Sequence, residues 1–318
     1  MLFTPGYAVQ ARELTQLQTV IQNQIQKFGN NIMNNGSKVV GGEISNQDCI
    51  YIRVKKQEPI GGTSDVDVTK FYGTDLIPYI DNVDDTRRAK VLLGITTDIS
   101  SNDDYPILCV QYINGGASGE LGEQFGANTL IKGICGSNEY YAEIATVSSD
   151  PFDATSYDGV TGDAKLTTVN NGIFFVDGFF VKTNLQSSCP YSLTGAGSDY
   201  DIRKFSSPTS RVGFSTSKNI ITSDNDYTLR DPASGAYNYN APGSNRYNIE
   251  LKLDFKNFEN HSTAGATAFG DNNFFELVRW VDGNIQLKKQ YTDYSELEKT
   301  LARRTYDESG SYTIKPFE

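Results

Sequence analysis

The sequence predicts a mainly β protein, in which a long N-terminal α-helix is followed by antiparallel β-sandwich or barrel-like units and a short C-terminal helix. Two patterns predict this order. Apolar residues recur at the helical period near the start of the chain, and from residue 37 onward short runs alternate between apolar and polar residues. The 29 glycines and 19 tyrosines fit β-structure with many turns.

One apolar stripe predicts the N-terminal helix. Its members are spaced by 3, 4, 4, 3 and 4 residues, which places them on a single helix face, and Gly29 offers a stop signal. Either the chain's own β units cover this stripe, or the helix forms a small parallel bundle with copies of itself. The uncharged glutamines beside it fit the bundle, because like chains would not repel there. The stripe consists of Leu14, Leu17, Ile21, Ile25, Phe28 and Ile32.

Strand-like runs occupy most of the remaining chain. Asp177-Gly178 and Asp282-Gly283 each stand between two such runs and predict tight hairpins. The regular spacing of the runs favours an antiparallel sandwich or barrel over a βαβ sheet. The predicted strands are residues 37–42, 48–54, 66–72, 90–96, 107–113, 130–134, 140–147, 172–183, 211–215, 247–255, 274–281, 285–290 and 312–315.

Composition shifts divide the chain into four segments. Residues 1–35 form the helix, which serves oligomerisation or docking, and residues 36–187 form a first β domain. A polar stretch at residues 188–207 is the predicted linker, and residues 208–318 form a second β domain. That domain contains the short helix 295–304, which a capping box of Ser295 and Glu298 begins.

The charge balance excludes several classes of partner. With 28 basic and 39 acidic residues, the net charge of −11 argues against nucleic acid and against an anionic membrane surface. No run of 18 apolar residues is present, so we expect no membrane insertion.

The four cysteines are widely spaced and include no C-x-x-C pair. Cys49, Cys109 and Cys135 stand in apolar, strand-like contexts, where free thiols are usually buried. The alternative is one disulfide. Reduced, cytosolic synthesis is the simpler interpretation.

The sequence contains few residues that could carry out chemistry. His261 is the only histidine, so a site with two histidine ligands is impossible, and no phosphate-binding or nucleophile-elbow motif occurs. We therefore expect no enzyme activity, no catalytic residue, no metal and no cofactor. Paired aspartates could serve a polysaccharide depolymerase or a weak Ca²⁺ site, but aspartates in turns normally cap their own backbone. The pairs are Asp65/Asp67, Asp103/Asp104, Asp150/Asp153 and Asp224/Asp226.

A tyrosine-rich loop at residues 227–247 is a candidate partner-contact loop. It combines aromatic rings with Asn, Gly, Ser and Arg, a mixture typical of antibody-like contact surfaces. The alternative is an ordered Ω-like loop that packs on its own sheet. The candidate contact residues are Tyr227, Tyr237, Tyr239, Arg246 and Tyr247.

Several blocks of the sequence resemble a domain of unknown function that recurs in virion proteins of tailed bacteriophages, notably tail and baseplate proteins of contractile-tailed cyanophages. The blocks cover most of the chain. They are FTPGYAVQARELTQLQ (3–18), DVTKFYG (67–73), NGIFFVDGFFV (171–181), RVGF (211–214), TLRDPASGAYNYNAPG (228–243) and LARRTYDESGSYTIKPF (301–317).

The resemblance implies a structural protein of the virion, which connects the baseplate to tail fibres or pins through contacts with other tail and baseplate proteins. It also implies a homotrimer, made in the host cytoplasm and located in the viral tail. Members of that family usually extend beyond both ends of this chain, so we expect a short version or the ordered part of a longer protein. The alternative function is a tail fibre or spike head that binds a host-surface receptor or polysaccharide.

Overall fold

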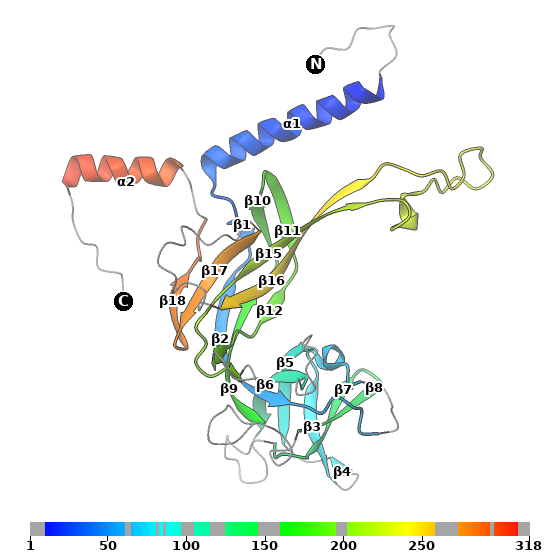
Figure 1. Ribbon diagram of the computed structural model, residues 1–318, viewed down its shortest axis with the longest axis vertical. Helices are drawn as coiled ribbons and strands as arrows, with labels where there is room; N and C mark the ends of the chain where they lie inside the picture. The colour runs from blue at the N-terminus through cyan, green and yellow to red at the C-terminus, as the bar shows by residue number, and fades with distance from the viewer. Residues whose placement is uncertain are drawn as a thin grey trace.

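A computed structural model describes residues 10–60, 65–80, 83–84, 87–96, 105–114, 125–145, 160–194, 202–257, 273–292 and 296–310. The protein is mainly β, with a helix near each end of the described chain, as predicted. Figure 1 shows a barrel at the bottom, a sandwich of sheets above it and a long helix across the top.

The N-terminal helix ends at Ile32, the last residue of the predicted stripe, whereas the C-terminal helix extends beyond its predicted end. Helix α1 (Ala11–Ile32) begins after Gln10, whose backbone N–H donates to a Glu13 carboxylate oxygen at 2.8 Å. It continues through Gly29, the stop signal that the sequence offered, to Ile32. Helix α2 (Glu296–Ser309) ends at Gly310, which has a left-handed φ of 71°. No glycine or proline lies between Glu296 and Gly310, which explains why the predicted end at residue 304 was too early.

The barrel is formed by six strands of the nine-stranded sheet, in the order β2-β6-β5-β3-β7-β8. A bridge between Val54 and Ile144 brings the end of β8 back to β2 and closes the barrel. Its interior holds apolar side chains such as Phe71, Leu76 and Leu108, all 1% exposed or less. The strands are β2 (Ile44–Arg53), β3 (Asp75–Ile80), β5 (Arg88–Ile95), β6 (Ile107–Asn114), β7 (Leu130–Cys135) and β8 (Asn138–Glu143), with the short β4 (Val83–Asp84) beside β3.

The sandwich packs a four-stranded sheet, β16-β15-β17-β18, on the three-stranded sheet β1-β10-β11 and the ends of β2 and β9. Phe174, Phe214 and Trp280 belong to its core. The strands are β1 (Ser37–Gly41), β9 (Thr161–Val169), β10 (Gly172–Val176), β11 (Phe179–Thr183), β12 (Gln186–Ser188), β15 (Ser210–Ile221), β16 (Arg246–Asn257), β17 (Phe274–Val281) and β18 (Asn284–Lys288).

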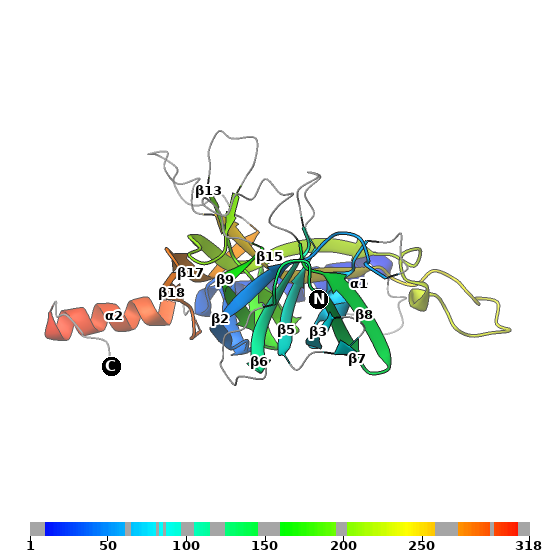
Figure 2. The same cartoon turned by 90° about the horizontal axis from the view of Figure 1, so that it is seen from below.

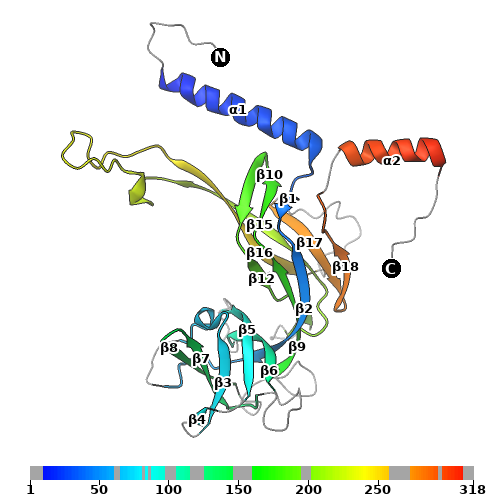
Figure 3. The same ribbon diagram turned by 180° about the vertical axis from the view of Figure 1, so that it is seen from behind.

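The sandwich and the barrel share two long strands. Strand β2 pairs with β9 from Ile44↔Val169 to Ile52↔Thr161, and Figure 3 shows β2 passing from the upper sheets into the barrel. The barrel strands β3 to β8 are therefore inserted between β2 and β9. The sandwich core, in turn, combines strands from both predicted β domains.

The described part of the predicted linker, residues 188–207, is packed. Cys189 and Phe205 are at most 2% exposed and join Tyr51 in a third apolar cluster. The segment also forms a small two-stranded sheet of β13 (Ser192–Thr194) and β14 (Ile202–Lys204). The polar composition concealed these apolar anchors.

Several predicted strands need correction. Residues 66–72 form the 3-10 helix η1 (Val68–Phe71), because the Asp67 side chain caps it and Val68 and Phe71 both face the barrel core. Strands β3, β4, β9, β12, β13 and β14 were not predicted, and residues 312–315 lie outside the described residues. Both predicted hairpins are present, since β10–β11 and β17–β18 each turn through an Asp-Gly pair with positive φ.

The cysteines are free in the structure. Cys49, Cys109 and Cys189 are buried in the same cluster, where hydrogen bonds to the other two sulfurs and burial raise the pKa of Cys109 well above its usual 9.0. The prediction that Cys135 is buried was wrong. It is the last residue of β7, beside the turn at Gly136, and its side chain is exposed.

Candidate interaction surfaces

Helix α1 docks on the β10–β11 hairpin through its amide-bearing face. The Gln22 Nε2 donates to the Gly178 carbonyl oxygen at 3.0 Å. Gly29 lies against the Phe175 ring so closely that a Cβ there would be 2.3 Å from Cζ. Just beyond the helix, Asn35 accepts a hydrogen bond from the Asp177 backbone N–H at 2.8 Å. The face that packs on the protein is thus the polar one.

The apolar stripe is left largely exposed. Leu14, Ile21, Ile25 and Phe28 are 39 to 68% exposed, and Leu17 and Ile32 are half-buried. Ile21 is one residue, and so about 100° of rotation, away from the docked Gln22. The described β units therefore leave most of the predicted stripe exposed. Val20, which the helical period did not include, adds a further exposed apolar side chain.

The β10–β11 turn also holds the base of a projecting arm. Strand β15 pairs with β17 only over Ser210–Ser215, so the rest of β15 forms a two-stranded ribbon with β16. Within this ribbon Lys218 forms an ion pair with Asp177, which raises the pKa of Lys218. The Tyr247 ring packs 5.5 Å from Phe179. The same turn thus fixes both α1 and the ribbon.

Residues 222–245, called the tip below, extend beyond the ribbon. In Figure 1 the tip projects away from the body toward the same side as the N-terminal end of α1, and Figure 2 shows it clear of the barrel. Four of the five predicted contact residues are exposed tyrosines at the tip or its root: Tyr227, Tyr237, Tyr239 and Tyr247. The fifth, Arg246, is exposed and donates to Ser244.

Local hydrogen bonds order the tip. Asp226 caps the 3-10 helix η2 (Tyr227–Leu229) by accepting from the N–H and hydroxyl of Thr228. The Arg230 guanidinium pairs with Asp224 and lies 4.9 Å from the centre of the Tyr227 ring. Further along, Asp231 and Ala241 are joined by a backbone hydrogen bond of 3.0 Å. The tip is therefore held together by its own hydrogen bonds and is not a loop packed on its own sheet.

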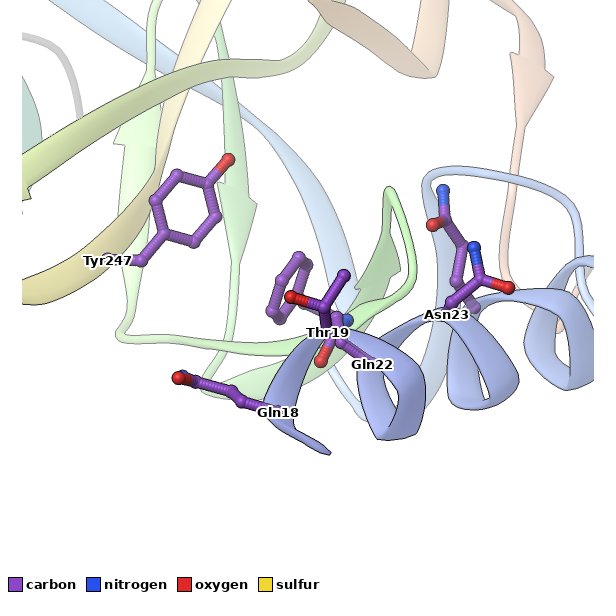
Figure 4. A pocket seen from close by; sticks show the side chains of 7 residues that line it. Gln18, Thr19, Gln22, Asn23 and Tyr247 are labelled. Carbon is purple, nitrogen blue, oxygen red and sulfur yellow. The ribbon is translucent and has the colours of Figure 1, made fainter. Parts of the chain in front are cut away.

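A pocket of about 340 Å³ lies between α1 and the root of the arm. We call it the amide pocket. Figure 4 shows Gln18, Thr19 and Gln22 of α1 on one side and Tyr247 of β16 on the other. Its lining contains no charged side chain. It consists of Gln18, Thr19, Gln22, Asn23, Gln26, Phe179 and Tyr247.

The predicted carboxylate pairs serve local structure where they are described. Asp67 and Asp226 each cap a 3-10 helix, and Asp224 pairs with Arg230. Hydrogen bonds from the hydroxyls of Thr69 and Thr228 lower the pKa of Asp67 and Asp226. Asp103, Asp104, Asp150, Asp153 and His261 lie outside the described residues.

Within the described ranges, no three His, Cys, Asp or Glu side chains are grouped so as to hold a metal ion. Neither α1 nor the described part of α2 is long and apolar enough to cross a membrane.

Sequence comparison places the chain in a family. The profile of a domain of unknown function, DUF4815, matches residues 154–318, slightly more than half of the chain. The chain belongs to the DUF4815 family. In this DUF4815 protein the matched range contains β9 to β18, the tip and α2, whereas α1 and the strands of the barrel precede it. Neither the curated proteins nor the solved structures gave a match.

Proposed function

We propose that this DUF4815 protein is a structural component of a bacteriophage tail, which connects the baseplate to tail fibres or pins through protein–protein contacts. The exposed apolar stripe of α1 carries the proposal. A helix that docks its amides and presents Ile21, Ile25 and Phe28 to solvent is suited to a partner that covers them. The sequence resemblance to tail and baseplate proteins supports the location in a virion.

The occupant of the stripe is a second and third copy of the same helix. Thirteen consecutive residues of α1, 14–26, carry no charge, which matters for copies that each have a net charge of −11. Burial stabilises by roughly 1.5–3 kcal/mol for each large apolar side chain, so the four exposed members offer an upper limit of about 6–12 kcal/mol per copy. We call the interface between three parallel copies of α1 the seam. Burial of the four side chains in this seam stabilises the homotrimer.

Charge substitutions in the stripe test the proposal. Ile21→Asp with Ile25→Asp should reduce the particle in sedimentation from three chains to one, and leave the β-sheet circular dichroism unchanged. The matched control is Gln16→Asp with Lys27→Asn, which shifts the net charge by the same two units on another face of α1. An assembly that survives the stripe variant, or dissociates equally in both, contradicts the seam.

The virion location has its own test. Mass spectrometry of purified particles of the phage that encodes this chain should find it in the tail fraction. Its absence from intact tails would refute the structural role.

A second candidate function is a receptor- or polysaccharide-binding fibre head, and the exposed tyrosines of the tip favour it. It predicts saturable binding of the isolated protein to host cells or glycans. Loss of that binding in Tyr237→Ala, without a change in particle mass, would separate it from the connector role.

A further inference from the structure

We propose that Cys49 and Cys189 form an oxidation site, at which a peroxide converts two buried thiols into one disulfide bond. The third buried cysteine, Cys109, stays reduced. This inference goes beyond the proposed function and does not rest on it, because it concerns thiols inside one chain and needs no second copy.

Three thiols from separate segments of the chain meet in one apolar cluster. Cys49 lies on β2, Cys109 lies on β6, and Cys189 directly follows β12. All three are at most 5% exposed. Each sulfur is hydrogen-bonded to the other two. A disulfide needs Cβ atoms about 3.5–4.5 Å apart, so thiols that already contact each other are close to the required arrangement.

The strand register decides which pair can bond. Tyr51 is directly opposite Cys109 in the β2–β6 ladder, so Cys49 is a diagonal neighbour of Cys109 on the same face. Diagonal neighbours have Cα atoms roughly 7–8 Å apart, whereas a disulfide needs less than about 7 Å. A bond between Cys49 and Cys109 would therefore distort two paired strands. Cys189 lies outside the strands, so no ladder fixes its backbone and its sulfur can approach Cys49.

Cys49 is the thiol that reacts first. It is the most exposed of the three, at 5%, and hydrogen bonds from Cys109 and Cys189 lower its pKa to about 5. The thiolate is the form that attacks a peroxide.

The other two thiols remain protonated. Hydrogen bonds to Cys189 and Cys49, together with burial, raise the pKa of Cys109. The hydrogen bond to Cys109 lowers the pKa of Cys189, but the hydrogen bond to Cys49 and burial outweigh it, so this pKa is raised as well. Cys49 is therefore the nucleophile, and Cys189 is the thiol that resolves the oxidised intermediate.

The chemistry balances in two steps. The Cys49 thiolate attacks one oxygen of hydrogen peroxide and breaks the O–O bond, which gives a sulfenic acid and a hydroxide ion. The hydroxide takes up the proton that Cys49 had lost. The Cys189 sulfur then attacks the Cys49 sulfur, forms the S–S bond and displaces water. The two thiols together lose two protons and two electrons, and the peroxide is reduced to two molecules of water.

The bond would connect two parts of the fold. Strand β2 is shared by the barrel and the sandwich, and Cys189 begins the segment that leads to β13. Cys49 and Cys189 are some 140 residues apart in sequence, so the bond closes a long loop and lowers the entropy of the unfolded chain. A chain synthesised in a reducing compartment would therefore gain stability once it meets an oxidant.

Peptide mapping tests the inference in the full chain. In a Cys135→Ser background, which removes the exposed thiol, the folded protein is treated with hydrogen peroxide, alkylated with iodoacetamide while it is denatured, and digested with trypsin. Each buried cysteine then lies in a different peptide. We expect residues 39–53 to be linked to residues 183–203, and Cys109 to be alkylated within residues 91–132.

Two alanine variants in the same background separate the roles of the thiols. Cys109→Ala should still form the bond. Cys189→Ala should stop at the sulfenic acid of Cys49, which dimedone labels within residues 39–53, and Cys109 should remain reduced.

A thermal unfolding measurement checks the effect on stability. The oxidised protein should unfold about 5–10 °C above the reduced protein, because the closed loop is long, and dithiothreitol should abolish the difference. A bond from Cys109 to either other cysteine overturns the inference. So does a folded protein whose three buried thiols all stay reduced at a peroxide dose that oxidises Cys135 in the wild-type chain.

Discussion

The barrel buries its large apolar side chains, whereas the end of the molecule formed by α1 and the tip, the α1–tip end, exposes them. Phe71 of the barrel is 1% exposed and Phe28 of α1 is 68% exposed. The barrel closes its sheet through Val54 and Ile144, whereas the ribbon of β15 and β16 runs out into a projecting tip. The barrel is complete within one chain. The α1–tip end leaves large apolar and aromatic side chains exposed.

The largest expected effect comes from replacing one phenylalanine by alanine in each of the two regions. Phe71→Ala should lower the free energy of unfolding by about 3–5 kcal/mol, because it leaves a cavity beside Tyr140 in the barrel. Phe28→Ala should change the stability of the single chain by about 0.5 kcal/mol or less. Urea unfolding of dilute protein measures both.

The assembly should respond in the reverse order. Phe28→Ala should raise the dissociation concentration of the particle, and Phe71→Ala should leave it unchanged under conditions where the barrel is still folded. Equal losses of chain stability in the two variants would show that α1 is part of the folding core.

Alanine substitutions at two glycines with positive φ distinguish the loss of helix docking from the cost of backbone strain. Gly178→Ala should cost about 1–2 kcal/mol for its left-handed conformation and about 1–3 kcal/mol more, because its Cβ would lie 2.6 Å from Gln26 Cβ. Gly73→Ala has the same strain, with nothing within 4 Å of the added Cβ. Hydrogen exchange should therefore increase along α1 in Gly178→Ala alone. Equal exchange in both variants would contradict docking through this turn.

A pH titration should give the smallest effect. Asp67 and Asp226 cap 3-10 helices in the same way, and hydrogen bonds from threonine hydroxyls lower the pKa of both carboxyls below 3.8. Each cap is therefore intact above pH 4 and is lost as the pH falls through the lowered pKa. Because η1 also buries Val68 and Phe71 and η2 buries no residue, only η2 should open. NMR shifts of the Thr69 and Thr228 amides report this, and parallel shifts would refute it.

Local patterns predicted much of this architecture. The helical period identified α1 and its stripe, and the Asp-Gly pairs located two hairpins. The period could not show which face of α1 docks, because that depends on Gly178 and Phe175, which are some 150 residues away in sequence. Glutamines at positions 22 and 26 gave no signal that they, and not the isoleucines, would face the protein.

The features that the sequence did not predict were missed for similar reasons. Strand β9 contains Gly162, Asp163 and Lys165 and so resembles a loop, yet it pairs with β2 over nine residues. The tyrosines of the tip were predicted as contacts from composition alone. The amide pocket was not, since its α1 residues and Tyr247 come together only through the β10–β11 hairpin.

The solution mass of the wild-type protein, measured by light scattering over a range of concentrations, tests the central claim most directly. The exposed stripe predicts a stable particle near three times 35.1 kDa. A mass of one chain at every concentration would contradict self-association through α1.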